Sequence, residues 1–96
     1  MLVLVTYDVD TTTPEGQRRL RRVAKECMNY GQRVQNSVFE CVVDYTQFTQ
    51  LKISLKSIIS ESQDSIRFYH IGKNYETKVE TLGVKRGFNL EQELIL

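Results

Sequence analysis

The sequence has few of the residues from which common metal and redox centres are built. Its 96 residues include two cysteines, Cys27 and Cys41, and a single histidine, His70. The cysteines lack CxxC spacing, and a zinc site normally needs four ligands, so the sequence argues against a zinc centre. Both cysteines fall within apolar patterns, which predicts two buried free thiols in a reduced, cytoplasmic protein.

The chain also lacks an excess of charge of either sign and a long apolar run. The formal net charge is +1 although 26% of the residues are charged, so any nucleic-acid contact must come from a local patch. No apolar run reaches the roughly eighteen residues of a membrane helix, so we expect no membrane partner. The sequence contains no P-loop, no GxGxxG motif and no spacing that supports a serine–histidine–acid arrangement.

The hydrophobic pattern predicts one small domain of five strands and two helices. We expect strands over residues 1–8, 32–35, 38–43, 65–71 and 77–82, and helices over about 14–29 and 44–60. Thr13 before Pro14 fits an N-cap followed by proline at the first helical position, and Asp44 with Gln47 resembles a capping box. Gly31 is expected in the left-handed position that closes the first helix.

The element order β-α-β-β-α-β plus an extra strand is typical of a ferredoxin-like α+β domain, with an antiparallel sheet and both helices on one face. We assign residues 1–82 to this domain and residues 83–96 to a tail that ends in three apolar residues and is interpreted as a protein-contact segment. A chain this small buries only about 60–65% of its unfolded surface, so dimerisation at a sheet edge would help. Because the fold hosts many unrelated activities, function must be argued from individual residues.

Asp8 stands where the first apolar strand ends, so the scaffold holds its carboxylate rigidly within reach of solvent. Carboxylate oxygens are hard ligands that suit Mg²⁺ or Mn²⁺. One aspartate per chain is too little for a metal site, but two Asp8 side chains could share one ion across a two-fold axis. Such an ion could activate water for phosphodiester cleavage. The alternative is that Asp8 caps a turn and that the nearby Asp10 is solvated.

The first predicted helix carries a cluster of basic residues. Its members are Arg18, Arg19, Arg21, Arg22 and Lys25. Guanidinium groups match the bidentate geometry of phosphate, and Arg33, at the start of the next strand, could add to the same surface. We therefore predict nucleic-acid contacts by Arg18, Arg19, Arg22 and Arg33. The alternative is a solvated helix face with pairs four residues apart, such as Arg22–Glu26.

Three further residues are interpreted as structural rather than functional. His70 lies on a predicted strand, where a packed or hydrogen-bonded histidine is more common than a catalytic one. Tyr7 and Phe39 could stack on bases as aromatic residues do in sheet-type RNA binders. Both lie in predicted strands, however, and are interpreted as core residues.

Three segments together resemble one known family. They are the strand end from Val5 to Val9, the arginine-rich first helix, and the stretch from Gly31 to Cys41, whose R-V-Q-N-S-V-F block is the most specific part. Over roughly residues 1–80, and in the same element order, the chain resembles the small CRISPR-associated endonuclease family. This family is the non-integrase member of the two-protein machinery of spacer acquisition.

The resemblance implies a homodimer of ferredoxin-like protomers in which the fifth strand or the tail pairs with the other protomer's sheet. It implies that Asp8 holds a shared divalent ion, Mg²⁺ or Mn²⁺, for cleavage of RNA or DNA. It also implies that the family bridges two integrase dimers and that arginines clamp a prespacer duplex, for which Arg18, Arg19, Arg22 and Arg33 are the matching candidates. The leading hypothesis is a CRISPR adaptation subunit with a metal-dependent endonuclease site. The alternatives are a non-catalytic adaptor that binds duplex DNA and the integrase, a toxin-like ribonuclease, and an unrelated regulatory domain.

Overall fold

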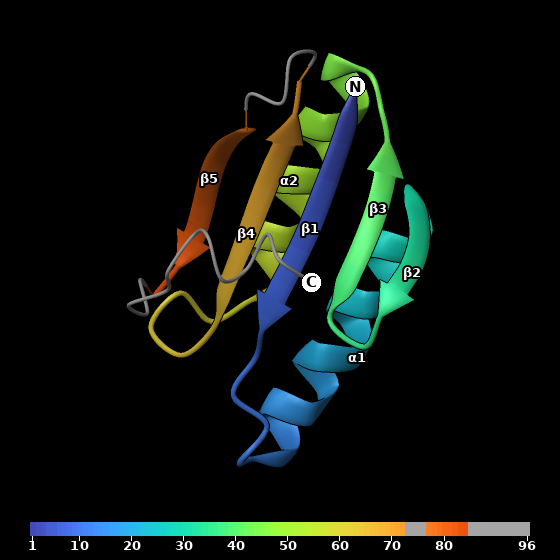
Figure 1. The fold of residues 1–96 in the computed structure, drawn as a ribbon. Helices are drawn as coiled ribbons and strands as arrows, with labels where there is room; N and C mark the ends of the chain where they lie inside the picture. The colour runs from blue at the N-terminus through green and yellow to red at the C-terminus, as the bar shows by residue number, and fades with distance from the viewer. Residues whose placement is uncertain (73–76, 85–96) are drawn as a thin grey trace.

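The computed structural model describes residues 1–72 and 77–84, which form a five-stranded antiparallel sheet and two helices (Figure 1). The strands are β1 (Leu2–Asp8), β2 (Gly31–Gln35), β3 (Val38–Val42), β4 (Ser65–Ile71) and β5 (Thr77–Gly83), and their order in the sheet is β2-β3-β1-β4-β5. The helices are α1 (Pro14–Met28) and α2 (Tyr45–Ile58). The prediction of an α+β ferredoxin-like fold with an extra strand is therefore confirmed.

Both helices lie behind the sheet in the view of Figure 1, so one face of the sheet carries the core and the other carries no described helix. Every second residue of β1 points into the core, beginning with Val3 and Val5. These side chains pack with the apolar stripes of the helices, which include Val23 of α1 and Leu51 of α2. The alternation leaves Leu4 half-buried on the opposite face.

The predicted helix starts are confirmed at the level of hydrogen bonds. The hydroxyl of Thr13 accepts a bond of 3.1 Å from the Gly16 N–H, and proline occupies the first helical position after it. At α2 the Asp44 carboxylate accepts from the Gln47 N–H at 2.7 Å, while the Gln47 side chain accepts from the Asp44 N–H at 2.9 Å. Both caps satisfy N–H groups that a helix cannot pair internally.

The prediction for Gly31 is wrong. This glycine is the first residue of β2 and does not have a positive φ, whereas Gly83 has a φ of 84°. Helix α1 ends at Met28, and its C-cap Asn29 has an ordinary right-handed conformation with short-range bonds, so no left-handed residue is needed. Glycine is required at position 31 for another reason: a Cβ there would overlap the Glu40 carbonyl oxygen and lie 2.7 Å from the sulfur of Cys41.

The remaining expectations agree with the structure within one or two residues. Helix α2 ends at Ile58 because Ile59 is already extended, and β3 ends at Val42 rather than at Val43. Cys27 and Cys41 are buried free thiols, as predicted. Neither described helix has the length and apolar content that a membrane crossing requires. The predicted protein-contact tail falls outside the described residues from position 85 onward, so its role stays a prediction.

Candidate functional site

Asp8 is the last residue of β1 and the only exposed position of that strand. It pairs in register with Ser65 of β4, whereas the pairing of β1 with β3 ends earlier, at Thr6 and Val38. The strand alternation directs Asp8 to the face on which no described helix lies. A central strand therefore presents one carboxylate at its end, on the open side of the sheet.

A positive side chain lies on the same face, one strand away. Arg67 of β4 pairs in register with Thr6, so it is the diagonal neighbour of Asp8 across the β1–β4 ladder. Diagonal neighbours in an antiparallel pair are about 7–8 Å apart, within the reach of a long side chain. Sequence reasoning missed Arg67, although its position opposite the end of the first strand follows once the strand order is known.

Within the part of the chain that the structure describes, no three histidine, cysteine, aspartate or glutamate side chains come together as a metal site. The carboxylate of Asp10, two residues after Asp8, closes its own turn. Its Oδ1 accepts bonds from the Thr12 N–H at 3.0 Å and the Thr12 hydroxyl at 2.6 Å. Asp10, which the alternative interpretation of the sequence left solvated, is thus a turn former.

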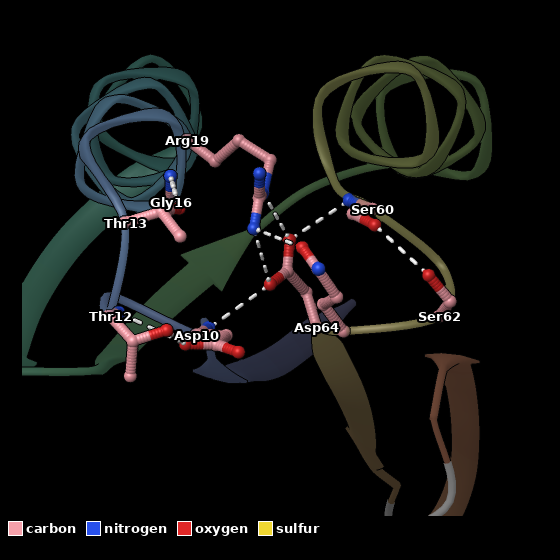
Figure 2. A network of polar contacts seen from close by, with 9 residues as sticks. Asp10, Thr12, Thr13, Gly16, Arg19, Ser60, Ser62 and Asp64 are labelled. Carbon is pink, nitrogen blue, oxygen red and sulfur yellow. Dashed lines mark hydrogen bonds and ion pairs between the residues drawn. The ribbon is translucent and has the colours of Figure 1, made fainter.

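The segment that follows Asp8 is held by a buried carboxylate, Asp64, which sequence reasoning also missed (Figure 2). Asp64 is 0% exposed and lies in the connection just before β4. Its Oδ1 accepts from the Asp10 N–H at 3.0 Å, and its Oδ2 accepts from the Ser60 N–H at 2.9 Å. The Nε of Arg19 donates to Oδ2 at 2.8 Å. Buried carboxylates are rare unless they are paired in this way.

The structure separates the predicted nucleic-acid-binding arginines into two groups. Arg18 and Arg22 are exposed on α1, four residues apart and therefore on one helix face. Arg19 points the other way: its side chain is 16% exposed, and a second bond joins its Nη2 to the Gln63 side-chain oxygen at 3.0 Å. The bond to Asp64 raises the pKa of Arg19 above its ordinary value.

Arg33 lies on the exposed edge strand β2 and packs against aromatic residues of the core. Its guanidinium carbon is 5.2 Å from the centre of the Phe39 ring, a cation–π distance. Tyr7 stacks on the same ring, with centroids 6.1 Å apart. Burial raises the pKa of Tyr7, and a hydrogen bond with Arg33 opposes that rise. Both aromatic side chains are buried, which confirms the prediction that they belong to the core.

His70 and the two cysteines do not form a site with Asp8, because they lie on the helix-covered face or in the core. His70 is half-buried on the helix-covered face, pairs in register with Val3 at the other end of β1, and packs edge-on against Phe48 at 4.7 Å. Its Nε2 is 3.3 Å from a carboxylate oxygen of Glu80. This agrees with the interpretation of His70 as a packed strand residue. Burial raises the pKa of Cys27 to about 12 and that of Cys41 to about 11, so neither thiol is an activated nucleophile.

Comparison with known proteins gives a consistent family. The family model described as CRISPR associated protein Cas2 matches residues 1–79. The CRISPR-associated endonuclease Cas2 of Halalkalibacterium halodurans is 61% identical over 99% of both chains, and the CRISPR-associated endoribonuclease Cas2 of Chlorobaculum tepidum is 56% identical over the full length of both. The crystal structure of Streptococcus pyogenes Cas2 at pH 6.5 superposes with a TM-score of 0.72 and 63% identity, covering 78% of this chain and 90% of the other.

Proposed function

This chain belongs to the CRISPR associated protein Cas2 family, and from that premise we propose that it is a homodimeric, metal-dependent endonuclease of CRISPR spacer acquisition. The observation that carries the proposal is the position of Asp8: an exposed carboxylate at the end of the central strand, on a sheet face without a described helix. The names of the relatives, which call them endonuclease or endoribonuclease, support phosphodiester cleavage as the reaction.

Dimerisation through this sheet face would bring two Asp8 side chains together, which one chain cannot do alone. Apolar side chains on the face support a second copy as its cover, because Val42 is 74% exposed and pairs in register with the half-buried Leu2. Two facing carboxylates fit Mg²⁺ or Mn²⁺, which needs only one or two protein carboxylates. When bound, the ion supplies Lewis-acid polarisation of a phosphate oxygen and a more acidic water.

The chain's own residues hold and orient the nucleic acid. Arg18 and Arg22 offer two exposed guanidinium groups on one face of α1, and Arg33 offers a third on β2. Contacts of this kind bind the phosphate backbone of duplex DNA or RNA without reading sequence. A partner integrase subunit and a cytoplasmic location complete the proposal, because spacer acquisition requires both.

A non-catalytic adaptor is the second candidate, and one observation favours it. The described residues hold only a single candidate ligand at the site, whereas exposed arginines are plentiful. An adaptor would bind duplex DNA and the integrase through these arginines and would not depend on Asp8.

The test compares cleavage of labelled duplex DNA and of single-stranded RNA by the wild type, by Asp8→Asn and by Glu61→Gln. Asp8→Asn keeps the size of the side chain and removes its charge, and Glu61→Gln removes an exposed loop carboxylate as a matched control. We expect a loss of at least about 100-fold for Asp8→Asn and for chelator-treated wild type, and none for Glu61→Gln. Unchanged cleavage by Asp8→Asn contradicts the site, and duplex binding without any cleavage favours the adaptor.

A further inference from the structure

The carboxylate of Asp64 connects three segments that are far apart in the sequence. It accepts bonds from the backbone of the loop after β1, from the backbone at the end of α2 and from a side chain of α1 (Figure 2). The bond from the Asp10 N–H acts only two residues beyond Asp8. The carboxylate therefore fixes the chain direction at the point where it leaves the proposed site.

The same loop is held on its other side by the first turn of α1. A Cβ at Gly16 would overlap the carbonyl oxygen of Asp10 and lie 2.9 Å from its carbonyl carbon. The backbone of Asp10 is thus held on both sides, because Asp64 accepts from its N–H and Gly16 packs on its carbonyl. Val9, between Asp8 and Asp10, is buried in the core. The two positions that follow the strand, Val9 and Asp10, therefore have little freedom.

The guanidinium of Arg19 is engaged in this network rather than facing solvent. Two of its nitrogens bond to Asp64, Nε at 2.8 Å and Nη2 at 3.4 Å, and Nη2 also bonds to Gln63 at 3.0 Å. A nucleic-acid phosphate could recruit Arg19 only by leaving a fully buried carboxylate without its counter-charge. Breaking one half of a buried ion pair is strongly unfavourable, so exposed neighbours such as Arg18 are better placed to bind phosphate.

We infer that Asp64 and Arg19 are positioning residues: they fix the end of β1 so that Asp8 is held ready for its ion, and Arg19 does not contact phosphate. The role of Asp8 in this inference rests on the proposed function. The inference replaces the sequence-based prediction that Arg19 is a nucleic-acid ligand. It also explains why one arginine of α1, Arg19, bonds to a buried carboxylate while its neighbours are exposed.

The test uses full-length protein with Arg19→Gln, Asp64→Asn, the two changes combined, Arg18→Gln, and Lys56→Gln as a control. Lys56 is exposed near the end of α2, so its variant removes one positive charge outside the network. Three quantities are measured: the salt dependence of duplex DNA affinity, hydrogen exchange at the Asp10 amide, and kcat and KM of cleavage as functions of Mg²⁺ concentration.

For Arg19→Gln we expect the salt slope of duplex binding to equal that of wild type, and exchange at the Asp10 amide to be about 10- to 100-fold faster. We also expect kcat to fall and the Mg²⁺ requirement to rise while KM for the duplex stays unchanged. Arg18→Gln should do the reverse: the slope falls by about 0.9 and the Asp10 amide stays protected. Lys56→Gln should change neither the salt slope nor the exchange rate of the Asp10 amide.

The combined variant separates positioning from general damage. Arg19→Gln alone leaves a buried carboxylate without its counter-charge, whereas adding Asp64→Asn makes the pair neutral and keeps one side-chain oxygen for the Asp10 N–H, while the bond from the Ser60 N–H is lost. We therefore expect the combined variant to protect the Asp10 amide better, and to cleave faster, than Arg19→Gln alone. If Asp64→Asn alone does not fold, comparison of Arg19→Gln with the combined variant still shows whether the two residues position the loop.

Two results would overturn the inference. One is a salt slope that falls as much in Arg19→Gln as in Arg18→Gln, which would make Arg19 a phosphate ligand. The other is a normal kcat and Mg²⁺ requirement when the Asp10 amide exchanges freely. A wild type that neither cleaves nor binds Mg²⁺ refutes the proposed function instead, and the salt slope and the exchange rate still decide whether Arg19 serves the fold or the nucleic acid.

Discussion

Gly16→Ala tests the packing of α1 against the loop that follows Asp8. Two effects of this substitution change the free energy of unfolding in opposite directions. Alanine is the better helix former, and the exchange is worth at most about 1 kcal/mol of stabilisation, because Gly16 lies in the first turn of α1 and not in its interior. The new Cβ, however, would overlap the Asp10 carbonyl oxygen, which is backbone and cannot rotate away. We expect the overlap to dominate and the variant to be less stable than the wild type.

The size of the stability loss follows from the displacement of the Asp10 backbone that the new Cβ requires. Displacing the Asp10 peptide weakens its N–H bond to the buried Asp64 carboxylate, and bonds to charged groups are worth about 1.5–3 kcal/mol. Overpacking adds about 1–3 kcal/mol, and the helix propensity offsets about 1 kcal/mol. The net loss is about 1.5–5 kcal/mol, and each kcal/mol shifts the Tm of a domain of this size by about 4–8 °C. We therefore expect a Tm lower by at least about 6 °C.

The assay is thermal unfolding followed by circular dichroism, with Gln17→Ala as the control on the same helical turn. Gln17 is exposed, and its side-chain amide donates a long bond of 3.4 Å to the Thr11 carbonyl, so its replacement should stay within about 0.5 kcal/mol of wild type. A Gly16→Ala protein with a Tm equal to or above that of wild type would show that the loop yields freely. The reasoning that makes this loop a rigid support for Asp8 would then be refuted.

Two pH-dependent effects are expected at groups remote from Asp8. Because burial raises the pKa of Cys27 to about 12 and that of Cys41 to about 11, the free energy of unfolding should fall as the pH rises above about 9, where the unfolded thiols ionise first. Urea titrations between pH 8 and 11 measure this, and rapid alkylation of the native protein at pH 8 would contradict it. At acid pH, the bond from Lys52 lowers the pKa of Glu80, so the stability it provides is present above the ordinary pKa of 4.5 and is lost as the pH falls through and below it. The 46% exposure of Glu80 limits the effect to less than about 1 kcal/mol, and Lys52→Gln should remove it; equal acid profiles for the two proteins would count against the pair.

The parts of the fold that the sequence predicts well are those decided by neighbouring residues. The caps at Thr13 and Asp44 depend on side chains within three residues of one another, and their hydrogen bonds form as predicted. Gly31 is the instructive failure: its requirement for glycine comes from the Glu40 carbonyl and Cys41 sulfur on the adjacent strand, which no local pattern reveals. A glycine after a helix can be required either for a left-handed cap or for the close approach of another strand, and only the strand pairing distinguishes the two.

The candidate site shows the same division. The strand end at Asp8 follows from a run of apolar residues and a carboxylate, both visible in the sequence. The role of Arg19 does not, since its counter-charge lies 45 positions away and charge spacing on a helix cannot say which guanidinium is used internally. Asp64, an isolated aspartate directly before an apolar strand, carried no signal that distinguished it from a turn residue.

The distribution of charge gives the proposed nucleic-acid interface a direction. Helix α1 carries five basic and two acidic side chains, a net charge of +3, whereas the whole chain has +1, so the rest of the molecule is net negative. A polyanion is therefore attracted most strongly to α1. Arg19 adds little to that attraction at short range because Asp64 neutralises it 2.8 Å away.

Helix α1 begins directly after the loop held by Asp64, so the network that orients Asp8 also anchors the start of the helix that presents Arg18 and Arg22. The network inside the fold and the exposed face of α1 thus serve different steps, so a change inside the network should alter kcat, whereas a change on the exposed face of α1 should alter affinity.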